Sequence, residues 1–399
     1  MATPTTAVET GRPTVLTGTW LFDGHEMKPD AVVLIEGRRI VAAGHGIAHP
    51  QDAEIVDLSG ATLLPGLIDT HVHLAFDASE DPVGRLAALD DTEALAAMAE
   101  AARLALRGGV TTVRDLGDRD YLSLKLRDSA SPELPTILAS GPPITIPEGH
   151  CHFLGGVAMP GLDGIRAAVR EHAERGVDVV KIMASGGQLT PGSRQDLAQF
   201  SPGELAAAVA EAHRHGLPVT AHAHGTAAVV DAATAGVDGL EHVSFWSLDG
   251  VDEPPPDTVR TIVDHQIVVG MTLGMAPAAG AQPPVEILRR LPLMLANLRA
   301  LRDAGALCVV GTDAGLGPIK PHDVLRHAVP QLGSLGFDPT EALRTVTAVA
   351  ARVCGLADTK GMLAPGFDAD ILAVEGNPLT DPDVIHRIRA VFARGVRVR

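Results

Sequence analysis

The stretch Gly66–Phe76, "GLIDTHVHLAF", ends an apolar, strand-like run with two histidines placed two residues apart. Side chains alternate between the two faces of a β-strand, so His71 and His73 share one face. Two imidazoles in this position have two interpretations: they are hydrogen-bonded within a core, or they bind a metal ion. The pair by itself does not separate these interpretations, so the rest of the chain has to be considered.

Composition limits the classes of protein to which the chain can belong. It has 399 residues, of which 46% are hydrophobic, which predicts one large barrel with an accessory domain, or two to three domains. The formal net charge of −17 argues against a nucleic-acid or anionic-membrane partner. Three cysteines without CxxC spacing argue against a disulfide framework. No signal-like start and no run of ~18 apolar residues is present, so we expect a cytoplasmic protein without membrane contact.

After residue 62 the chain alternates β-branched apolar runs with Ala- and Leu-rich helical stretches. One such helix is expected to begin after Ser201 as N-cap, with Pro202 in its first turn, and to end at Gly216. Alternation of this kind predicts a parallel sheet, and eight strands fit a (β/α)8 TIM barrel, with a doubly wound open sheet as the alternative. The eight strand candidates are "GLIDTHVH", "VTTVRDLG", "LPTILASG", "VDVVKIMASGG", "LPVTAHAHG", "VDGLEHVS", "QIVVGMTLG" and "ALCVVGTDAG".

Both ends of the chain have a different, β-rich character. Residues 14–56 read as short strands with a hairpin turn at Gly37, and the tail repeats this pattern in "GMLAPGFDADILAVEGNPL" and "IRAVFARGVRVR". We therefore predict a small accessory, β-sandwich-like domain built from residues 1–62 and 355–399, with the α/β barrel between them at residues 63–354.

Ionisable side chains mark the ends of four further predicted strands. Barrel active sites are built at the carboxyl ends of the strands, and buried ionisable groups are costly unless something satisfies them. Five strand ends with ligand-type side chains therefore predict bound cations. The additional residues are Lys181, His222, His224, His242 and Asp313. Desolvation lowers the pKa of a lysine in an apolar strand, so the neutral amine of Lys181 is accessible; the alternative is an ion pair of Lys181 with Asp313 in a metal-free site.

The motifs "GLIDTHVHL", "VKIMASGG", "AHAHG", "EHVS" and "GTDAG", in this order, resemble the amidohydrolase superfamily. The similarity is greatest to its imidazolonepropionase-like branch, which includes Xaa-Pro dipeptidases (prolidases), and it extends from about residue 14 to the end. The resemblance implies a binuclear metal centre in which Lys181, carboxylated by CO2, bridges two divalent ions. Zn(II) is the expected metal, with Mn(II), Co(II) or Fe(II) allowed. The other implied ligands are His71, His73 and Asp313 for one ion and His222 and His242 for the second.

The resemblance also implies the chemistry. A hydroxide between the two ions attacks an amide carbonyl, and Asp313 takes its proton and passes it to the leaving nitrogen. His150, in the loop after the third strand, stabilises the oxyanion, with His152 as the other candidate. His224 contacts the substrate, a small N-acyl-amino acid, Xaa-Pro-type dipeptide or related amide. A homo-oligomer is expected.

Several alternatives remain open from the sequence. Phe200 stands where dipeptidase relatives often have a tyrosine whose hydroxyl meets a substrate carboxylate, so Phe200 is a candidate substrate contact without that hydroxyl. Arg194 or Gln188 could replace its function. The same metal chemistry could act on a lactone, a carbamate ester or a phosphotriester. A non-catalytic scaffold is a further alternative, which the full set of ligand-type residues disfavours.

Two further expectations concern residues outside this set. Arg114 and Asp115, at the end of the second predicted strand, are interpreted as a structural pair. His322 is expected on a helix, as a surface or packing residue.

Overall fold

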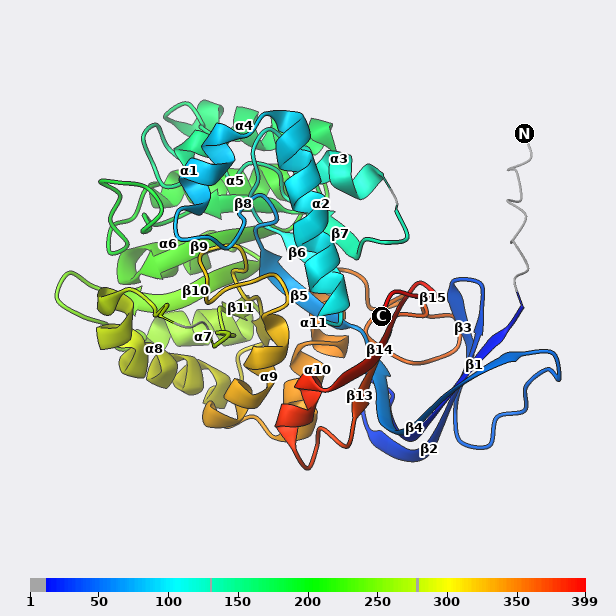
Figure 1. The fold of residues 1–399 in the computed structure, drawn as a ribbon. Helices are drawn as coiled ribbons and strands as arrows, with labels where there is room; N and C mark the ends of the chain where they lie inside the picture. The colour runs from blue at the N-terminus through cyan, green and yellow to red at the C-terminus, as the bar shows by residue number, and fades with distance from the viewer. Residues whose placement is uncertain (1–11, 130, 278–279) are drawn as a thin grey trace.

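The computed structural model describes residues 12–129, 131–277 and 280–399. Figure 1 shows two parts side by side: an α/β part with strands inside and helices outside, and a β part that contains both the start and the end of the described chain. The main hydrophobic cluster joins strands and helices of the α/β part, and a second cluster fills the β part.

The β part is one seven-stranded sheet, and it brings the two ends of the chain together as predicted. Its order is β15-β14-β13-β4-β1-β2-β3, and β4 pairs with β13 so that Leu63 faces Ala373. Residues of six strands contribute to one hydrophobic cluster, so the sheet curls over its own core. The strands are β1 (Thr14–Phe22), β2 (Met27–Glu36), β3 (Arg39–Gly44), β4 (Glu54–Pro65), β13 (Ile371–Glu375), β14 (Ile388–Ala393) and β15 (Val396–Arg397).

The α/β part contains all eight predicted strands, paired in parallel and in chain order. Three form one sheet, β5 (Leu67–Val72), β6 (Val110–Asp115) and β7 (Thr136–Ala139), and five form another, β8 (Val180–Met183), β9 (Val219–Gly225), β10 (Gly239–Trp246), β11 (Val268–Met271) and β12 (Cys308–Val310). Isolated parallel bridges, Val72 with Ala314 and Ile144 with Ile182, connect the two sheets at both ends. This arrangement is consistent with a TIM-barrel-like domain.

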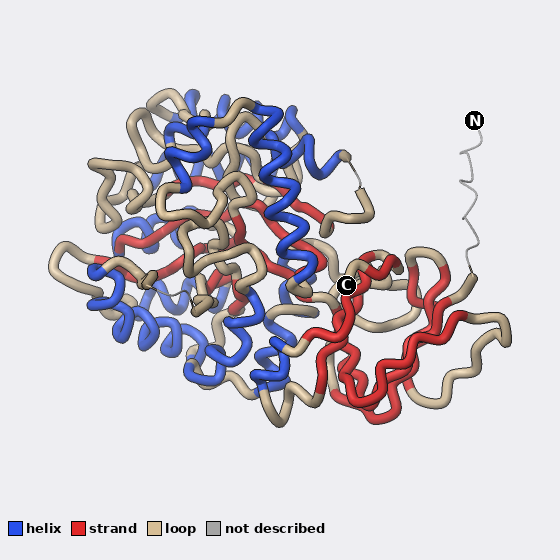
Figure 2. Tube along the Cα trace, in the orientation of Figure 1, coloured by secondary structure: helices blue, strands red, loops and turns tan. Residues whose placement is uncertain are grey.

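The helices lie around these strands (Figure 2). Ser201 caps α5 as predicted, and its hydroxyl accepts the Glu204 N–H in a capping box. No helix of the described ranges is long and apolar enough to cross a membrane. The helices are α1 (Pro82–Ala88), α2 (Asp91–Arg107), α3 (Leu122–Asp128), α4 (Leu162–Arg175), α5 (Pro202–Arg214), α6 (Thr226–Ala235), α7 (Pro256–Asp264), α8 (Val285–Asp303), α9 (Leu325–Ser334), α10 (Pro339–Thr345) and α11 (Ala348–Val353), with 3-10 turns η1 (His152–Leu154) and η2 (Pro382–His386).

Candidate metal centre

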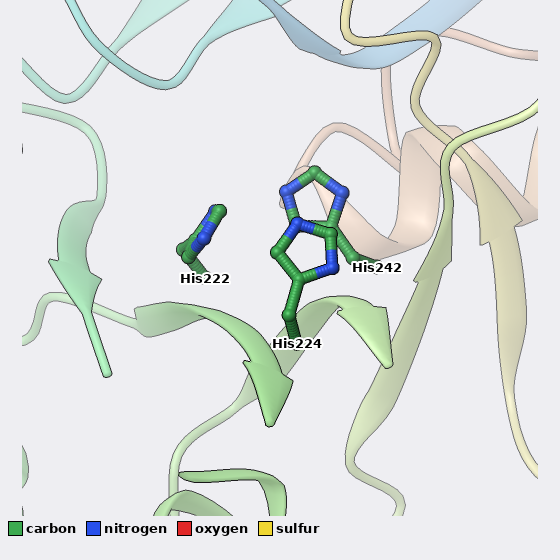
Figure 3. Close-up of side chains that lie close together, drawn as sticks. All are labelled: His222, His224 and His242. Carbon is green, nitrogen blue, oxygen red and sulfur yellow. The ribbon is translucent and has the colours of Figure 1, made fainter. Parts of the chain in front are cut away.

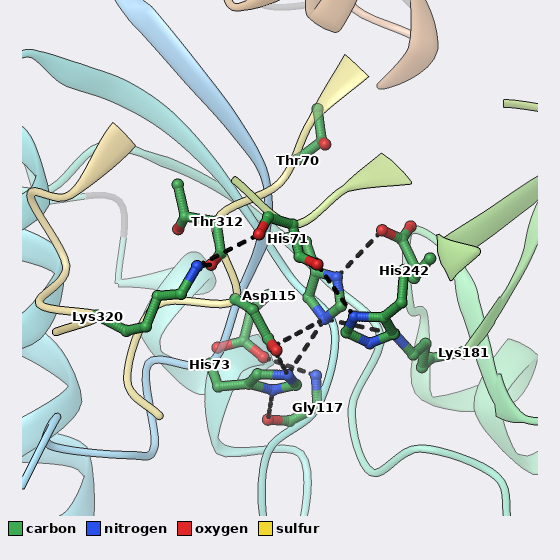
Figure 4. Close-up of polar contacts among 12 residues, drawn as sticks. Thr70, His71, His73, Asp115, Gly117, Lys181, His242, Thr312 and Lys320 are labelled. Carbon is green, nitrogen blue, oxygen red and sulfur yellow. Dashed lines mark hydrogen bonds and ion pairs between the residues drawn. The ribbon is translucent and has the colours of Figure 1, made fainter. Parts of the chain in front are cut away.

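The first group of ligand-type side chains comes from the ends of β5 and β12. The Nε2 atoms of His71 and His73 are 3.2 Å apart (Figure 4), and Asp313 Oδ1 lies 3.4 Å from the former and 3.2 Å from the latter. Ligand atoms held ~2.1 Å from one ion, at angles of about 90–109°, are about 3.0–3.4 Å apart. The spacing of these three atoms therefore fits a single cation.

Hydrogen bonds on the far side of both rings determine which nitrogen faces this group. His71 Nδ1 donates to Glu241 Oε2 at 3.0 Å, and His73 Nδ1 donates to the Gly117 carbonyl at 3.0 Å. Because a carboxylate and a carbonyl only accept, Nδ1 carries a proton in both rings, and Nε2 of the neutral ring offers its lone pair to the group. Metal-binding histidines are oriented in this way. Burial lowers the pKa of His71 to about 4, so this ring is neutral near pH 7.

Asp313 is ionised although it is largely buried. Burial raises its pKa, but His71 and His73 beside it hold the pKa well below its usual range. The backbone of Asp313 has φ +62°, in the left-handed region that residues other than glycine rarely adopt. Its N–H donates to the His71 carbonyl at 2.8 Å. The chain thus leaves the strand conformation at the point where the carboxylate meets the two imidazoles.

The second group contains His222, His224 and His242, from the neighbouring strands β9 and β10 (Figure 3). One nitrogen of each ring lies within 4.8 Å of the others. The His242 ring is 4.6 Å from that of His222 and 4.3 Å from that of His224, and it is stacked on the latter. His222 Nε2 donates to the Gly186 carbonyl at 3.1 Å, which leaves Nδ1 free. His224 Nδ1 bonds the Ser244 hydroxyl at 2.7 Å, which leaves Nε2 free.

Lys181 lies next to the first group and on the strand that pairs with β9 of the second. Its side chain is buried in β8, and Nζ is 3.4 Å from His71 Nε2. The rings of His71 and His242 are 5.4 Å apart, so the two groups are adjacent. Burial lowers the pKa of Lys181 to about 8. About one tenth of the amine is then neutral at pH 7, far more than for an exposed lysine.

His150 is buried against the second group. Its ring is 4.8 Å from that of His222, and its Nδ1 is buried without a hydrogen-bond partner among the described residues. Burial lowers the pKa of His150 to about 3, so the ring is neutral. Gln199 Oε1 accepts the His150 backbone N–H at 2.6 Å, and Gln199 Nε2 donates to the Met183 carbonyl at 2.8 Å. Gln199, which no sequence motif indicated, thus ties the loop of His150 to the end of β8.

The remaining predicted candidates have other partners or lie elsewhere. His152 Nδ1 donates to the carbonyl of Gly149 at 2.9 Å. Phe200 is 5% exposed and packs within the main hydrophobic cluster. Arg194 forms an ion pair with Asp196 through Nε at 3.1 Å, and Gln188 is exposed.

Arg114 and Asp115 do not form the expected pair. Arg114 Nη2 donates to Glu241 Oε1 at 3.1 Å, whereas Asp115 accepts the backbone N–H groups of Leu74 and Gly117. The physical reason is that consecutive residues of a strand point to opposite faces, so their side chains meet different neighbours.

The expectation for His322 was also wrong in its position. His322 lies in a turn before α9 and is 3% exposed. Its Nε2 donates to the His73 carbonyl at 3.2 Å. His322 therefore holds the backbone at His73 in place without itself belonging to the first group.

Glu241 connects three strands beneath the first group, and sequence reasoning missed it. Its Oε1 accepts Arg114 Nη2 and, at 2.8 Å, Thr220 Oγ1, while Oε2 accepts His71 Nδ1. Burial opposes ionisation, but His71 and Arg114 lower the pKa of Glu241 to about 2. A Cβ on Gly270 would lie 2.1 Å from Oε2, so only glycine leaves room for this carboxylate on β11. The adjacent "EH" was the available signal.

We expect Glu241→Gln to weaken zinc binding by about 10–100-fold, the usual range for loss of an outer partner of a metal-binding histidine. The amide keeps the shape but loses the charge, and its NH2 group accepts nothing from His71 or Arg114. Competition with a chromogenic chelator measures the affinity. Glu174→Gln, on the exposed face of α4, is the matched control and should bind zinc as wild type does. Wild-type affinity in Glu241→Gln would contradict the role of Glu241.

The two groups of ligand-type side chains lie at the carboxyl ends of the strands of an α/β domain, and comparisons place the chain in a family. The model of the amidohydrolase family matches residues 62–398. The ochratoxinase of Aspergillus niger is 30% identical over 356 residues, covering 82% of this chain and 73% of that protein. The imidazolonepropionase of Deinococcus deserti is 28% identical over 413 residues, covering 92% of each.

A solved structure of a prolidase also resembles this chain over nearly its whole length. A prolidase complexed with N-methylphosphonate-L-proline superimposes with a TM-score of 0.82 at 28% identity, covering 97% of this chain and 99% of that one. The chain therefore belongs to the amidohydrolase family, as the motifs predicted. It is an enzyme of the class that hydrolyses amide bonds.

Proposed function

We propose that the protein is a binuclear metal-dependent amidohydrolase that cleaves the C–N bond of an N-acyl-amino acid, an Xaa-Pro-type dipeptide or a related small amide. The observation that carries this proposal is the meeting of two ligand groups, five histidines from β5, β9 and β10 with Asp313, around the buried Lys181. The 28% identity to a prolidase complexed with a proline phosphonate supports the substrate class. We also infer that the eight strands close into a (β/α)8 barrel, which the two isolated bridges between the sheets support.

The residues present fit two ions. His71, His73 and Asp313 would hold one, through Nε2 of each ring and a carboxylate oxygen. His222 would bind the second through Nδ1, the nitrogen that its bond to Gly186 leaves free, together with His242. Oxygen and nitrogen donors of this kind suit Zn(II), with Mn(II), Co(II) and Fe(II) allowed.

Lys181 would connect the two ions as a carbamate. The neutral Nζ adds to the carbon of CO2 and releases one proton, which gives a carboxylate with two oxygens. Burial, which favours the neutral amine, supports this reaction. Burial lowers the pKa of His71, the imidazole nearest to Nζ, to about 4, so this ring adds no positive charge near pH 7. The carbamate charge would be balanced by the cations.

Two divalent ions held by these residues would lower the pKa of a water and polarise the scissile carbonyl. Asp313, held ionised by its surroundings, would accept a proton from the attacking water and deliver it to the leaving nitrogen. His150, which is neutral, donates a hydrogen bond to the oxyanion that develops on the carbonyl oxygen. Nδ1 of His150 is buried and has no hydrogen-bond partner among the described residues, which supports a hydrogen bond from this ring to the substrate.

His224 is proposed to orient the substrate. Its bond to Ser244 holds the ring beside His242, with Nε2 free to meet an amide or carboxylate group. Phe200 would shape the apolar wall behind the site from within the core. The domain boundaries at 62 and 354, the homo-oligomer and the cytoplasmic location stay predictions.

The proposal is tested by metal analysis combined with a substrate panel. Purified protein is expected to carry about two zinc-type ions per chain and to lose activity on chelation, with recovery on adding zinc. The panel contrasts prolyl dipeptides, N-acyl-amino acids and aryl amides with lactones, carbamates and a phosphotriester. Faster turnover of a lactone or phosphotriester than of any amide would replace the proposed reaction, and a protein that binds no metal would overturn the centre itself.

Changing His224 to Asn should raise KM by about tenfold, the effect of losing one good hydrogen bond to substrate, while metal content stays near that of wild type. The reason is that Nε2 of His224 is assigned to substrate and not to an ion. Steady-state kinetics and metal analysis of the same preparation measure both quantities. His25→Asn, an exposed histidine of the β part, serves as the control. Loss of one ion with KM unchanged would exchange the roles of His222 and His224.

A further inference from the structure

Lys320 lies in the loop after β12, and its side chain turns back toward the strand ends (Figure 4). Its Nζ donates to the Thr312 carbonyl at 2.8 Å and reaches the carbonyls of Thr272 and Leu273 at 3.4 Å each. The loop is closed by a hydrogen bond from the Gly315 N–H to the Lys320 carbonyl at 2.8 Å. None of the sequence motifs that contain the ligand-type residues includes Lys320.

The three carbonyls lie where the parallel ladder has ended. The last paired residues of β11 and β12 are Met271 and Val310, so Thr272 and Thr312 lie beyond the regular strand pairing. Main-chain carbonyls in a protein interior need donors, and an ammonium group has three. Lys320 thus takes the place of strand pairing at the point where the two strands separate.

Each of the two segments that Lys320 joins is linked to a different ligand group. The Thr312 carbonyl is part of the peptide that continues into Asp313, whose backbone has the unusual φ of +62°. Thr272 Oγ1 lies 3.3 Å from His242 Nδ1. On its other side Thr312 is bound by Asp69, which accepts both the Thr312 N–H at 2.9 Å and its hydroxyl at 2.6 Å.

The support from Lys320 matters because the backbone at Asp313 is strained. A residue other than glycine in the left-handed region persists only when its surroundings hold it there. The peptide before Asp313 is held by its own N–H, which donates to the His71 carbonyl, by Asp69 from β5 and by Lys320 from the side of β11. Without the lysine, one of these three restraints is lost, and the carboxylate is held less firmly relative to the imidazoles.

We infer that Lys320 is a positioning residue of the active site, which ties the Asp313 segment to the Thr272 segment and so sets the separation of the two ligand groups. The inference rests on the proposed metal centre. It differs from a substrate-binding role because the three donors of the ammonium face main-chain carbonyls.

The experiment compares Lys320→Met, which keeps length and volume but removes every donor, with Lys320→Arg, which keeps charge and donors. Lys125→Met, the same substitution on the exposed side of α3, is the matched control. Each variant is stripped of metal and titrated with zinc alone against a chelator, and kcat and KM are then measured at saturating zinc. Circular dichroism establishes that each variant is folded.

For Lys320→Met we expect zinc affinity to fall by about 10–100-fold, as for other outer supports of a metal site. At saturating zinc, kcat should fall by about tenfold, because misplacing reacting groups by a fraction of an ångström costs rate, while KM stays within about twofold. Lys320→Arg should recover zinc affinity to within about threefold, which a role as a mere volume filler would not produce.

Three outcomes would overturn the inference. Wild-type zinc affinity and kcat in Lys320→Met would show that the tie is unnecessary. A raised KM with unchanged zinc affinity would make Lys320 a substrate contact. A wild-type protein that binds no zinc would remove the metal centre and the inference together. Should Lys320→Met not fold, Lys320→Gln keeps two N–H donors without the charge, and zinc affinity must then decrease in the order wild type, Arg, Gln.

Discussion

Replacing Lys181 with alanine should empty the proposed metal centre and lower kcat/KM by at least about 10³-fold, or about 4 kcal/mol of transition-state stabilisation. The reason is the position of the lysine: it is buried next to His71, on the strand beside the one that carries His222. Alanine removes the amine that we propose is carboxylated to connect the two ligand sets. Metal analysis of the purified variant and its kinetics on the best amide of the panel measure the effect.

The Lys181→Ala variant also offers a rescue experiment. The cavity left by the side chain has the length of a lysine, so formate, acetate or propionate can enter it and present two oxygens. We expect such acids, at millimolar concentration with zinc present, to restore part of both metal content and activity. Lys125→Ala, on the exposed side of α3, is the control and should behave as wild type. Retained activity with normal metal content would refute the bridging role.

Asp313→Asn should lower kcat by about 10³–10⁴-fold, the upper part of the range for losing a general acid–base group in combination with a ligand charge. The amide cannot accept a proton, and it removes the negative charge that faces His71 and His73 at 3.4 and 3.2 Å. We expect KM to change little, because Asp313 is assigned to proton transfer and to an ion. Kinetics at saturating zinc, with metal content determined in parallel, separate loss of turnover from loss of metal.

Two comparisons make the Asp313 experiment decisive. Asp264→Asn, at the exposed end of α7, should leave both quantities unchanged. A kcat close to wild type in Asp313→Asn would remove this residue as the proton carrier. A full loss of zinc with partial recovery of turnover at high zinc would reduce its role to that of a ligand.

The strands and the ligand-type residues were predictable because both depend on short-range patterns of apolar and polar residues along the sequence. Alternation along β5 predicted that His71 and His73 share a face, and their Nε2 atoms lie 3.2 Å apart. The repeated strand–helix pattern predicted parallel neighbours in chain order, which the two sheets confirm. The tail after residue 361 was correctly expected to pair with the N-terminal strands.

Alternation failed where the chain leaves regular strand geometry. Neighbouring residues of a strand should face opposite sides, yet Glu241 bonds His71 while the His242 ring also lies 5.4 Å from it. The backbone at His242 has φ +73°, so the strand is interrupted there and both side chains reach the same region. Nothing in the sequence "LEHVS" indicates this departure, which accompanies a shift in the pairing register of β9 and β10 after His242.

The sequence by itself determined the order of the strands and the inventory of imidazoles, lysine and carboxylate at their ends. These follow from local periodicity and residue chemistry. The tertiary structure alone decided which nitrogen of each ring is free, that Arg114 pairs with Glu241, and that Gln199 and Lys320 hold the surrounding chain. Such contacts join residues as much as 170 positions apart, as in the His71–Glu241 pair, and only the packing of distant strands brings their atoms within bonding distance.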